Sequence, residues 1–248
     1  MKPKIAIIVP LIAPEVVKDW GYIQSCLNRT LHSVLKCNSV TLRIFVVCQS
    51  EPELMVEDPR ICFVESKNAI PQDRTAQGND KAAKLAEGMR AASEFDPDYV
   101  MSVDADDLVS KELFDYVVNE PGYDAYCVEI GYEWVDGSRK LTLRDHFHRF
   151  CGTSFILRYA VELFPVYLGR ETGVEPVCEQ SHTCRAKVLL AKNFEVYFII
   201  EPRVIYVAGG RDQLMDRKKR LRRRLKDAVY SLWRDKKLSQ DLRDEFSI

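Results

Sequence analysis

The sequence predicts an α/β fold built around a mostly parallel sheet. Short runs rich in β-branched residues, at 5–9, 42–48 and 61–65, show no polar–apolar alternation and end at turn-forming residues, as strands buried on both faces do. Apolar residues at helical spacing follow the first run, over 23–35, and the third run, over 82–92. A further apolar run covers 99–103. This order is the β-α-β pattern of an α/β domain.

The simple alternation ends near residue 107. We expect a helix near 111–119, a strand over 124–130 and a hairpin over 132–143 that turns at 136–138. A helix near 181–192 and strands at 196–200 and 204–207 are expected to follow. Residues 144–180 mix glycine and proline with aromatic residues, which predicts loops that shape a pocket.

Length and composition set the broad class. The 248 residues fit one α/β domain with a short appendage. Lys and Arg total 36 against 37 Asp and Glu, so the overall charge gives no argument for nucleic-acid binding. The eight cysteines form no CxxC pair and several lie in apolar runs, which indicates buried free thiols in a reducing, cytoplasmic compartment. No apolar run has the length expected of a secretory signal or a membrane span.

The C-terminal segment has a different character from the rest of the chain. Basic runs at 217–220 and 222–224 alternate with Leu and Val at helical intervals, which predicts a basic amphipathic helix over 211–246. We therefore divide the chain into a domain of residues 1–210 and a helical tail of residues 211–248. The simplest expectation is that the apolar stripe docks on the domain. Contact of 211–236 with the inner face of the membrane, or homo-oligomer formation, is the alternative.

An acidic cluster is the most informative feature of the chain. Asp104, Asp106 and Asp107 follow the apolar run at 99–103 directly. Ligands of open α/β sheets bind beyond the carboxyl ends of the strands. Neighbouring carboxylates repel one another unless a cation, a polyhydroxyl ligand or backbone N–H groups lie against them, and a divalent metal ion is the first candidate. The alternative is that Asp107 and Ser110 cap a helix beginning near Lys111, with the other two acids in solvent.

Several segments together resemble the family 2 glycosyltransferases of the GT-A fold, which has a Rossmann-like, mixed and mostly parallel sheet flanked by helices. These are the strands at 5–10 and 43–48, the Gly78-Asn79-Asp80-Lys81-Ala82-Ala83-Lys84 run with Gly88, and residues 99–107. Asp104-Ala105-Asp106 matches the DxD motif of that family. The resemblance is good over 1–107, the expected nucleotide-sugar half, and leaves 108–210 as the acceptor half. It implies transfer of a sugar from a nucleotide-diphosphate sugar to a hydroxyl of a carbohydrate or lipid-linked acceptor, with inversion.

The resemblance also implies a donor site. Asp106 would bind Mn²⁺ or Mg²⁺ bridging the donor diphosphate, and Asp104 would contact the ribose or a metal-bound water. Lys81, and with it Arg74, would add positive charge at the phosphates, although a solvated helix face is the alternative. The choice among uridine, guanosine and thymidine stays open. The other expected contacts are Pro10, Leu11 and Ile12 beneath the base, Gln49, Ser50 or Glu51 at its edge, Ala105 in the motif, and Arg211 over the diphosphate.

On the acceptor side, the resemblance implies an acidic general base. Among Glu171, Glu175 and Glu179 we favour Glu179 and then Glu175, although an ordinary acid at a helix start is the alternative. His182 could bind the metal or position the acceptor, or simply cap a helix or pack. Residues 152–155 resemble the acceptor segment. Core packing is the alternative for the aromatic residues expected beside that segment, which are Tyr132, Trp134 and His148.

Three other functions stand against this one. A degenerate GT-A domain could bind a nucleotide sugar without turnover. A haloacid-dehalogenase-type phosphatase also uses an Asp-x-Asp motif, but there the motif follows the first strand rather than a later one. Sugar nucleotidyltransferases share the fold but carry a Gly-rich signature after the first strand, and residues 10–14 contain no Gly.

Overall fold

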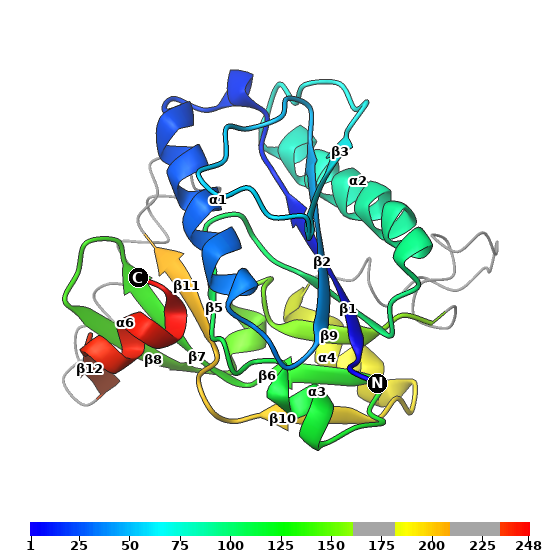
Figure 1. Cartoon of the computed structure of the whole chain (residues 1–248), viewed down its shortest axis with the longest axis vertical. Helices are drawn as coiled ribbons and strands as arrows, with labels where there is room; N and C mark the ends of the chain where they lie inside the picture. The colour runs from blue at the N-terminus through cyan, green and yellow to red at the C-terminus, as the bar shows by residue number, and fades with distance from the viewer. Residues whose placement is uncertain (161–181, 209–233) are drawn as a thin grey trace.

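Two sheets organise the chain (Figure 1). The computed structural model describes residues 1–160, 182–208 and 234–248. Within these residues, a larger sheet has the strand order β10-β6-β9-β4-β1-β2-β3 and a smaller one the order β12-β8-β7-β11-β5. The strands of the larger sheet are β1 (Lys4–Pro10), β2 (Thr41–Cys48), β3 (Ile61–Glu65), β4 (Tyr99–Ser102), β6 (Ala125–Val128), β9 (Phe155–Arg158) and β10 (Val196–Ile199).

The larger sheet is mixed and mostly parallel. Strands β4, β1, β2 and β3 pair in parallel, as do β6 and β10. Strand β9 is antiparallel to both β4 and β6, between which it lies. The predicted α/β class with a mostly parallel sheet is confirmed. Strand β9 itself falls in the region predicted to be loop, because its four residues are too few to stand out among the glycines and aromatics around them.

Helices cover both faces of this sheet (Figure 1). Residues of α1 (Trp20–Leu35) and α3 (Asp115–Asn119) pack with Ile5, Ile7 and Val9, whereas residues of α2 (Arg74–Ala92) and α4 (His182–Ala191) pack with Ala6 and Ile8. Alternate residues of β1 thus face opposite layers, and both are apolar, which is why the strand lacks polar alternation. The 3-10 turns are η1 (Pro14–Val16), η2 (Ser93–Phe95) and η3 (Phe147–Arg149).

Helix α2 lies unusually close to the sheet because Gly88 has no side chain. A Cβ at Gly88 would lie 2.5 Å from Ile8 Cγ2 and 2.9 Å from Val47 Cγ2. The helix begins at Arg74, earlier than its apolar periodicity suggests, because the carboxylate of Asp73 accepts a hydrogen bond from the Ala76 N–H and caps it. The early start carries the helix past the carboxyl edge of the sheet.

The smaller sheet carries its own core of Tyr132, Trp134, Ile205 and Phe246 with their neighbours. Its hairpin turns at Gly137, whose φ of 80° is left-handed, as the predicted turn at 136–138 requires. The guanidinium of Arg29 on α1 reaches this turn and donates two hydrogen bonds of 2.9 Å to Asp136. The strands are β5 (Leu108–Val109), β7 (Ile130–Val135), β8 (Lys140–Asp145), β11 (Val204–Ala208) and β12 (Asp235–Lys237).

The described C-terminal residues differ from the predicted amphipathic helix. Residues 235–237 form β12, which pairs with β8, so an unbroken helix over 211–246 is wrong at this point. Helix α6 (Gln240–Phe246) then brings Phe246 into the core of the smaller sheet, where it is fully buried. This end of the chain is therefore docked. The basic runs at 217–220 and 222–224 lie outside the described residues, and the domain boundary at 210 stays a prediction.

Three further expectations concern the helix near 111–119, the cysteines and membrane-spanning helices. The helix expected near 111–119 is confirmed only over Asp115–Asn119, as α3. Asp107 and Ser110 do not cap it, because its N-cap residue is Phe114. Among the described cysteines all are free, with Cys62 partly buried and Cys184 exposed and the others buried. In the described parts of the chain, no helix combines the length and apolar character needed to cross a bilayer.

The Arg29–Asp136 pair gives a test of how the two sheets are joined. Asp136→Asn should lower the free energy of unfolding at pH 7 by about 1–2 kcal/mol, because charge-assisted bonds are lost. Hydrogen bonding from Arg29 lowers the pKa of Asp136. The stabilisation of the fold by the Asp136 carboxylate is therefore complete above the usual carboxyl pKa. It disappears as the pH falls through the lower pKa that Asp136 has in the folded protein. Urea unfolding from pH 7 to about pH 3 should show the gap between the two proteins closing; a constant gap would contradict this account.

Candidate functional site

The acidic cluster lies at the carboxyl edge of the larger sheet, in the loop that joins β4 to β5. Strand β4 is parallel to β1, and the Val103 N–H continues their pairing by donating to Ile8 O at 2.9 Å. The Ala105 carbonyl accepts a 3.0 Å hydrogen bond from the Thr30 hydroxyl on α1. The loop is thus held at the position where ligands of open α/β sheets bind.

Asp107 fixes the loop from below. Its side chain is fully buried, and Oδ2 accepts hydrogen bonds from Thr153 Oγ1 at 2.6 Å and Cys151 Sγ at 3.0 Å. The Thr153 hydroxyl in turn accepts a hydrogen bond of 2.9 Å from the Asp104 N–H. Burial, with the charges of Asp106 and Asp104, raises the pKa of Asp107 well above its ordinary value. Asp107 is therefore a structural acid that anchors Asp104.

Asp104 points toward helix α2, where Lys81 Nζ lies 2.5 Å from its Oδ1. Burial lowers the pKa of Lys81, but the nearby carboxylate of Asp104, helped by Asp107 and Asp106, raises it overall. Lys81 is therefore a cation. The sequence analysis singled out Lys81, Asp104 and Asp106 separately, and the structure brings Lys81 and Asp104 into direct contact. The Lys81 side chain keeps 40% of its surface exposed, so it is both partly solvated and paired with Asp104.

Gly152 lies beside the second oxygen of Asp104. A Cβ at this position would lie 3.4 Å from Asp104 Oδ2, an ordinary van der Waals contact. Gly152 directly precedes Thr153, so one short segment both anchors the loop and borders the Asp104 carboxylate.

The donor set suits a hard cation that takes most of its ligands from elsewhere. Asp104 and Asp106 offer carboxylate oxygens, but no group of three or more His, Cys, Asp or Glu side chains able to hold a metal occurs among the described residues. Mg²⁺ and similar ions are commonly bound by one or two carboxylates together with substrate phosphates and water. The residues therefore fit such an ion only in company with a phosphate ligand.

A buried network supports the ends of β1 and β2. Lys84, which is 1% exposed, donates to Leu11 O at 2.6 Å and to Asp80 Oδ2 at 2.6 Å. Asp80 Oδ1 accepts from Gln49 Nε2 at 2.9 Å. The sequence analysis missed this network, although Asp80 and Lys84 are four residues apart on a predicted helix. Of the residues expected near the base, Leu11 is fully buried while Pro10 and Ile12 keep exposed surface and Glu51 is exposed.

On the acceptor side, His182 is the first residue of α4. Burial lowers its pKa, and the negative charge of Asp104 opposes that shift, so His182 lies within electrostatic reach of the acidic loop. Its predicted metal ligation stays a prediction. Tyr132 and Trp134 instead pack in the core of the smaller sheet, as the core-packing alternative states. The predictions for Glu171, Glu175, Glu179 and Arg211 fall outside the described residues.

Comparison with known proteins settles the fold. No protein-family model and no curated protein sequence matches the chain. Among solved structures, residues 1–349 of S. aureus TarS in complex with UDP-GlcNAc match with a TM-score of 0.52 and 13% identity, over 85% of this chain and 60% of that one. The chain has the GT-A fold. The cytidylyltransferase IspD of Francisella tularensis matches with a TM-score of 0.46 and 14% identity, over 86% of this chain and 96% of IspD.

The GT-A likeness concerns the fold alone. At 13% identity it does not transfer residues or activity, and the chain spans only 60% of the TarS fragment that it matches. The expected fold, stated from the strands and the Asp-Ala-Asp motif, is confirmed. The chemistry has to be argued from the residues at the carboxyl edge.

The Thr153 hydroxyl offers a direct test of how the loop is held. Thr153→Val should lower the free energy of unfolding by about 1–3 kcal/mol, because the buried Asp107 carboxyl loses one of its donors and the Asp104 N–H loses its acceptor. Thr153→Ser keeps the hydroxyl, loses only the methyl, and serves as the matched control. Urea unfolding of both variants measures the difference. A Thr153→Val variant that loses no more stability than Thr153→Ser would contradict the role of the hydroxyl.

Proposed function

We propose that this protein is a metal-dependent glycosyltransferase that moves a sugar from a nucleotide-diphosphate sugar to an acceptor hydroxyl, with inversion. The observation that carries the proposal is the Asp104-Ala105-Asp106 loop at the carboxyl edge of β4, contacted by the Lys81 ammonium, in a GT-A fold. The TarS structure with the same fold contains UDP-GlcNAc. A nucleotide sugar is the ligand class that this combination supports best.

The proposed metal site uses Asp106 and Asp104, next to Gly152. When bound, a divalent cation supplies positive charge that offsets the negative charge growing on the leaving diphosphate as the glycosidic bond breaks. The carboxylates would hold this charge at the end of β4. Because the chain offers a pair of acids here rather than a full set of ligands, we expect metal and nucleotide to bind together.

Lys81 has two tasks in this proposal. Without ligand its ammonium is paired with Asp104 at 2.5 Å, which limits the repulsion among the acids of the loop. With a diphosphate present, the same ammonium lies beside the phosphate oxygens and can donate to them. Lys81 would therefore help to bind the donor and to stabilise its leaving group, while Asp104 contacts the ribose or a metal-bound water.

The acceptor hydroxyl needs a base to take its proton as its oxygen attacks the anomeric carbon from the far side. We propose Glu179 for this role, with Glu175 as the second choice. Both precede α4, whose first residue, His182, lies within electrostatic reach of Asp104. A base in this part of the chain would therefore be close in sequence to a residue beside the acidic loop.

Replacing one motif acid tests the donor half. Purified protein is screened with UDP, GDP and dTDP sugars, with and without Mn²⁺, for release of the nucleoside diphosphate. Asp106→Asn should reduce the Mn²⁺-dependent release at least about 100-fold, because a charged oxygen ligand becomes a neutral amide. Asp96→Asn, at a 95% exposed acid before β4, is the matched control and should be silent. Donor binding without any turnover in the wild type would favour a degenerate, non-enzymatic domain, and an active Asp106→Asn variant would remove the motif from the mechanism.

The acceptor half is tested by the two glutamates. Glu179→Gln should retain donor affinity while transfer to the acceptor falls by about 10²–10⁴-fold, as loss of a general base predicts. Donor affinity is measured by calorimetry with the nucleotide and Mn²⁺, and transfer by product formation. If Glu175→Gln shows this pattern and Glu179→Gln does not, the assignment of the base moves to Glu175.

A further inference from the structure

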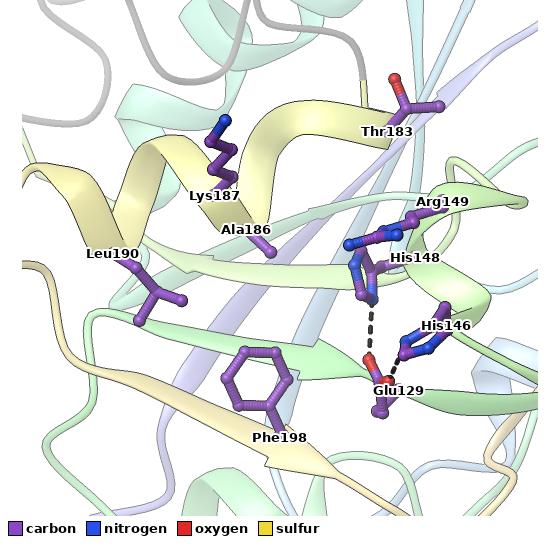
Figure 2. A pocket seen from close by; sticks show the side chains of 9 residues that line it. All are labelled: Glu129, His146, His148, Arg149, Thr183, Ala186, Lys187, Leu190 and Phe198. Atoms are coloured by element: carbon purple, nitrogen blue, oxygen red, sulfur yellow. Dashed lines mark ion pairs between the residues drawn. The ribbon is translucent and has the colours of Figure 1, made fainter.

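A pocket of about 460 Å³ opens between α4, η3 and β10 (Figure 2). Glu129 follows β6 directly, so the pocket also lies beyond the carboxyl end of a strand in the larger sheet. Its lining combines acidic, basic and apolar side chains, namely Glu129, His146, His148, Arg149, Lys187 and Phe198, together with small or aliphatic residues of α4.

The carboxylate of Glu129 contacts two imidazole rings. His146 Nδ1 lies 2.6 Å from Oε1 and His148 Nδ1 lies 2.9 Å from Oε2, and Figure 2 shows the two rings meeting the carboxylate from different directions. His148 is almost fully buried, whereas His146 is largely exposed. The backbone of His146 has a φ of 50°, a left-handed conformation that non-glycine residues adopt sparingly and that often occurs at functional positions.

Two cationic side chains also line the pocket. The side chains of Arg149 and Lys187 are exposed and make no hydrogen bond or ion pair with the part of the chain that the structure describes. Arg149 is close enough to His148 for its charge to lower the pKa of that imidazole, although burial is the larger cause and Glu129 opposes both. Because two cations stand against the single carboxylate of Glu129, the lining presents excess positive charge to a ligand.

The opposite side of the pocket is apolar. Phe198 on β10 keeps 37% of its surface exposed, and Leu190 on α4 keeps 50%. Figure 2 places the Phe198 ring across the pocket from Arg149. An exposed ring opposite two cations suits a ligand with one apolar face and one anionic group, such as a sugar ring that carries a carboxylate or a phosphate.

The pocket is connected to the candidate donor site by two shared segments. His148 and Arg149 of η3 line the pocket, and the chain then continues into Cys151 and Thr153, which bind Asp107. Helix α4 lines the pocket and begins at His182, whose pKa is affected by Asp104 as well as by His148. The pocket and the acidic loop therefore both lie at the carboxyl edge of the larger sheet, where an acceptor would bind next to a donor.

We propose that this pocket is an acceptor subsite for a sugar that carries an anionic group, with Arg149 and Lys187 binding the anion and Phe198 contacting the sugar ring. The inference rests on the proposed glycosyltransferase function and adds to it a class of acceptor. The rings of His146 and His148, which face Glu129 through Nδ1, can accept hydrogen bonds from the sugar hydroxyls through Nε2.

Three matched sugars test the pocket in the full-length protein: glucuronate, glucose 6-phosphate and glucose. Binding is followed through the NMR signals of the His146 and His148 rings. At least one charged sugar should bind about ten-fold or more tightly than glucose, and the stronger of the two shows whether carboxylate or phosphate is preferred. Equal affinity for glucose and both charged sugars, or no change at either ring, would overturn the proposal.

Variants separate this pocket from the donor site. Arg149→Gln and Lys187→Gln should each weaken binding of the charged sugar about ten-fold. Lys36→Gln, at an exposed lysine just after α1, is the matched control and should leave it unchanged. Binding of UDP with Mn²⁺, measured on the same samples, should be the same in all of them. If Arg149→Gln and Lys187→Gln still bind the charged sugar as the wild type does, the pocket is not the proposed acceptor subsite. If the wild type binds no nucleoside diphosphate, the proposed donor function is wrong instead.

Discussion

The buried carboxyl of Asp107 is the constraint on which the candidate site depends. It lies at the start of β5 with its oxygens enclosed by Cys151 and Thr153, and through the Thr153 hydroxyl it fixes the backbone of Asp104. A fully buried acid is costly unless it is protonated or hydrogen-bonded, and Thr153 and Cys151 meet this need by donating to Asp107. What it secures is a rigid loop whose two outer acids, Asp104 and Asp106, are held at the rim of the sheet.

Each layer of the fold contributes one contact to this loop. Helix α1 supplies the Thr30 hydroxyl, helix α2 supplies the Lys81 ammonium, and the segment after η3 supplies Gly152 and Thr153. The close packing of α2, made possible by Gly88, sets the distance between Lys81 and the sheet. The site is therefore built by three elements that lie far apart in the sequence and meet only at the carboxyl edge.

The sequence predicted the fold better than the site. Buried parallel strands such as β1 and β2 are recognisable in the sequence as unbroken apolar runs. An acid cluster directly after such a run indicates the carboxyl edge of the sheet. Pairings between distant segments leave no such pattern. The Thr153 hydroxyl beneath Asp107, the buried Lys84 and the imidazoles on Glu129 depend on how β9, α2 and η3 are placed in three dimensions. The sequence left a helix-capping role open for Asp107, because a buried acid and a helix cap look alike in sequence.

The central claim is that the rim acids hold a divalent cation together with a nucleoside diphosphate. The most direct measurement is anomalous diffraction at the manganese edge from crystals soaked with Mn²⁺ and, in turn, UDP, GDP and dTDP. The account predicts one anomalous peak between Asp106, Asp104 and the diphosphate, with Lys81 beside the phosphate oxygens. A soaked crystal in which the nucleotide is bound elsewhere, or in which no anomalous density lies near Asp104 and Asp106, would contradict it.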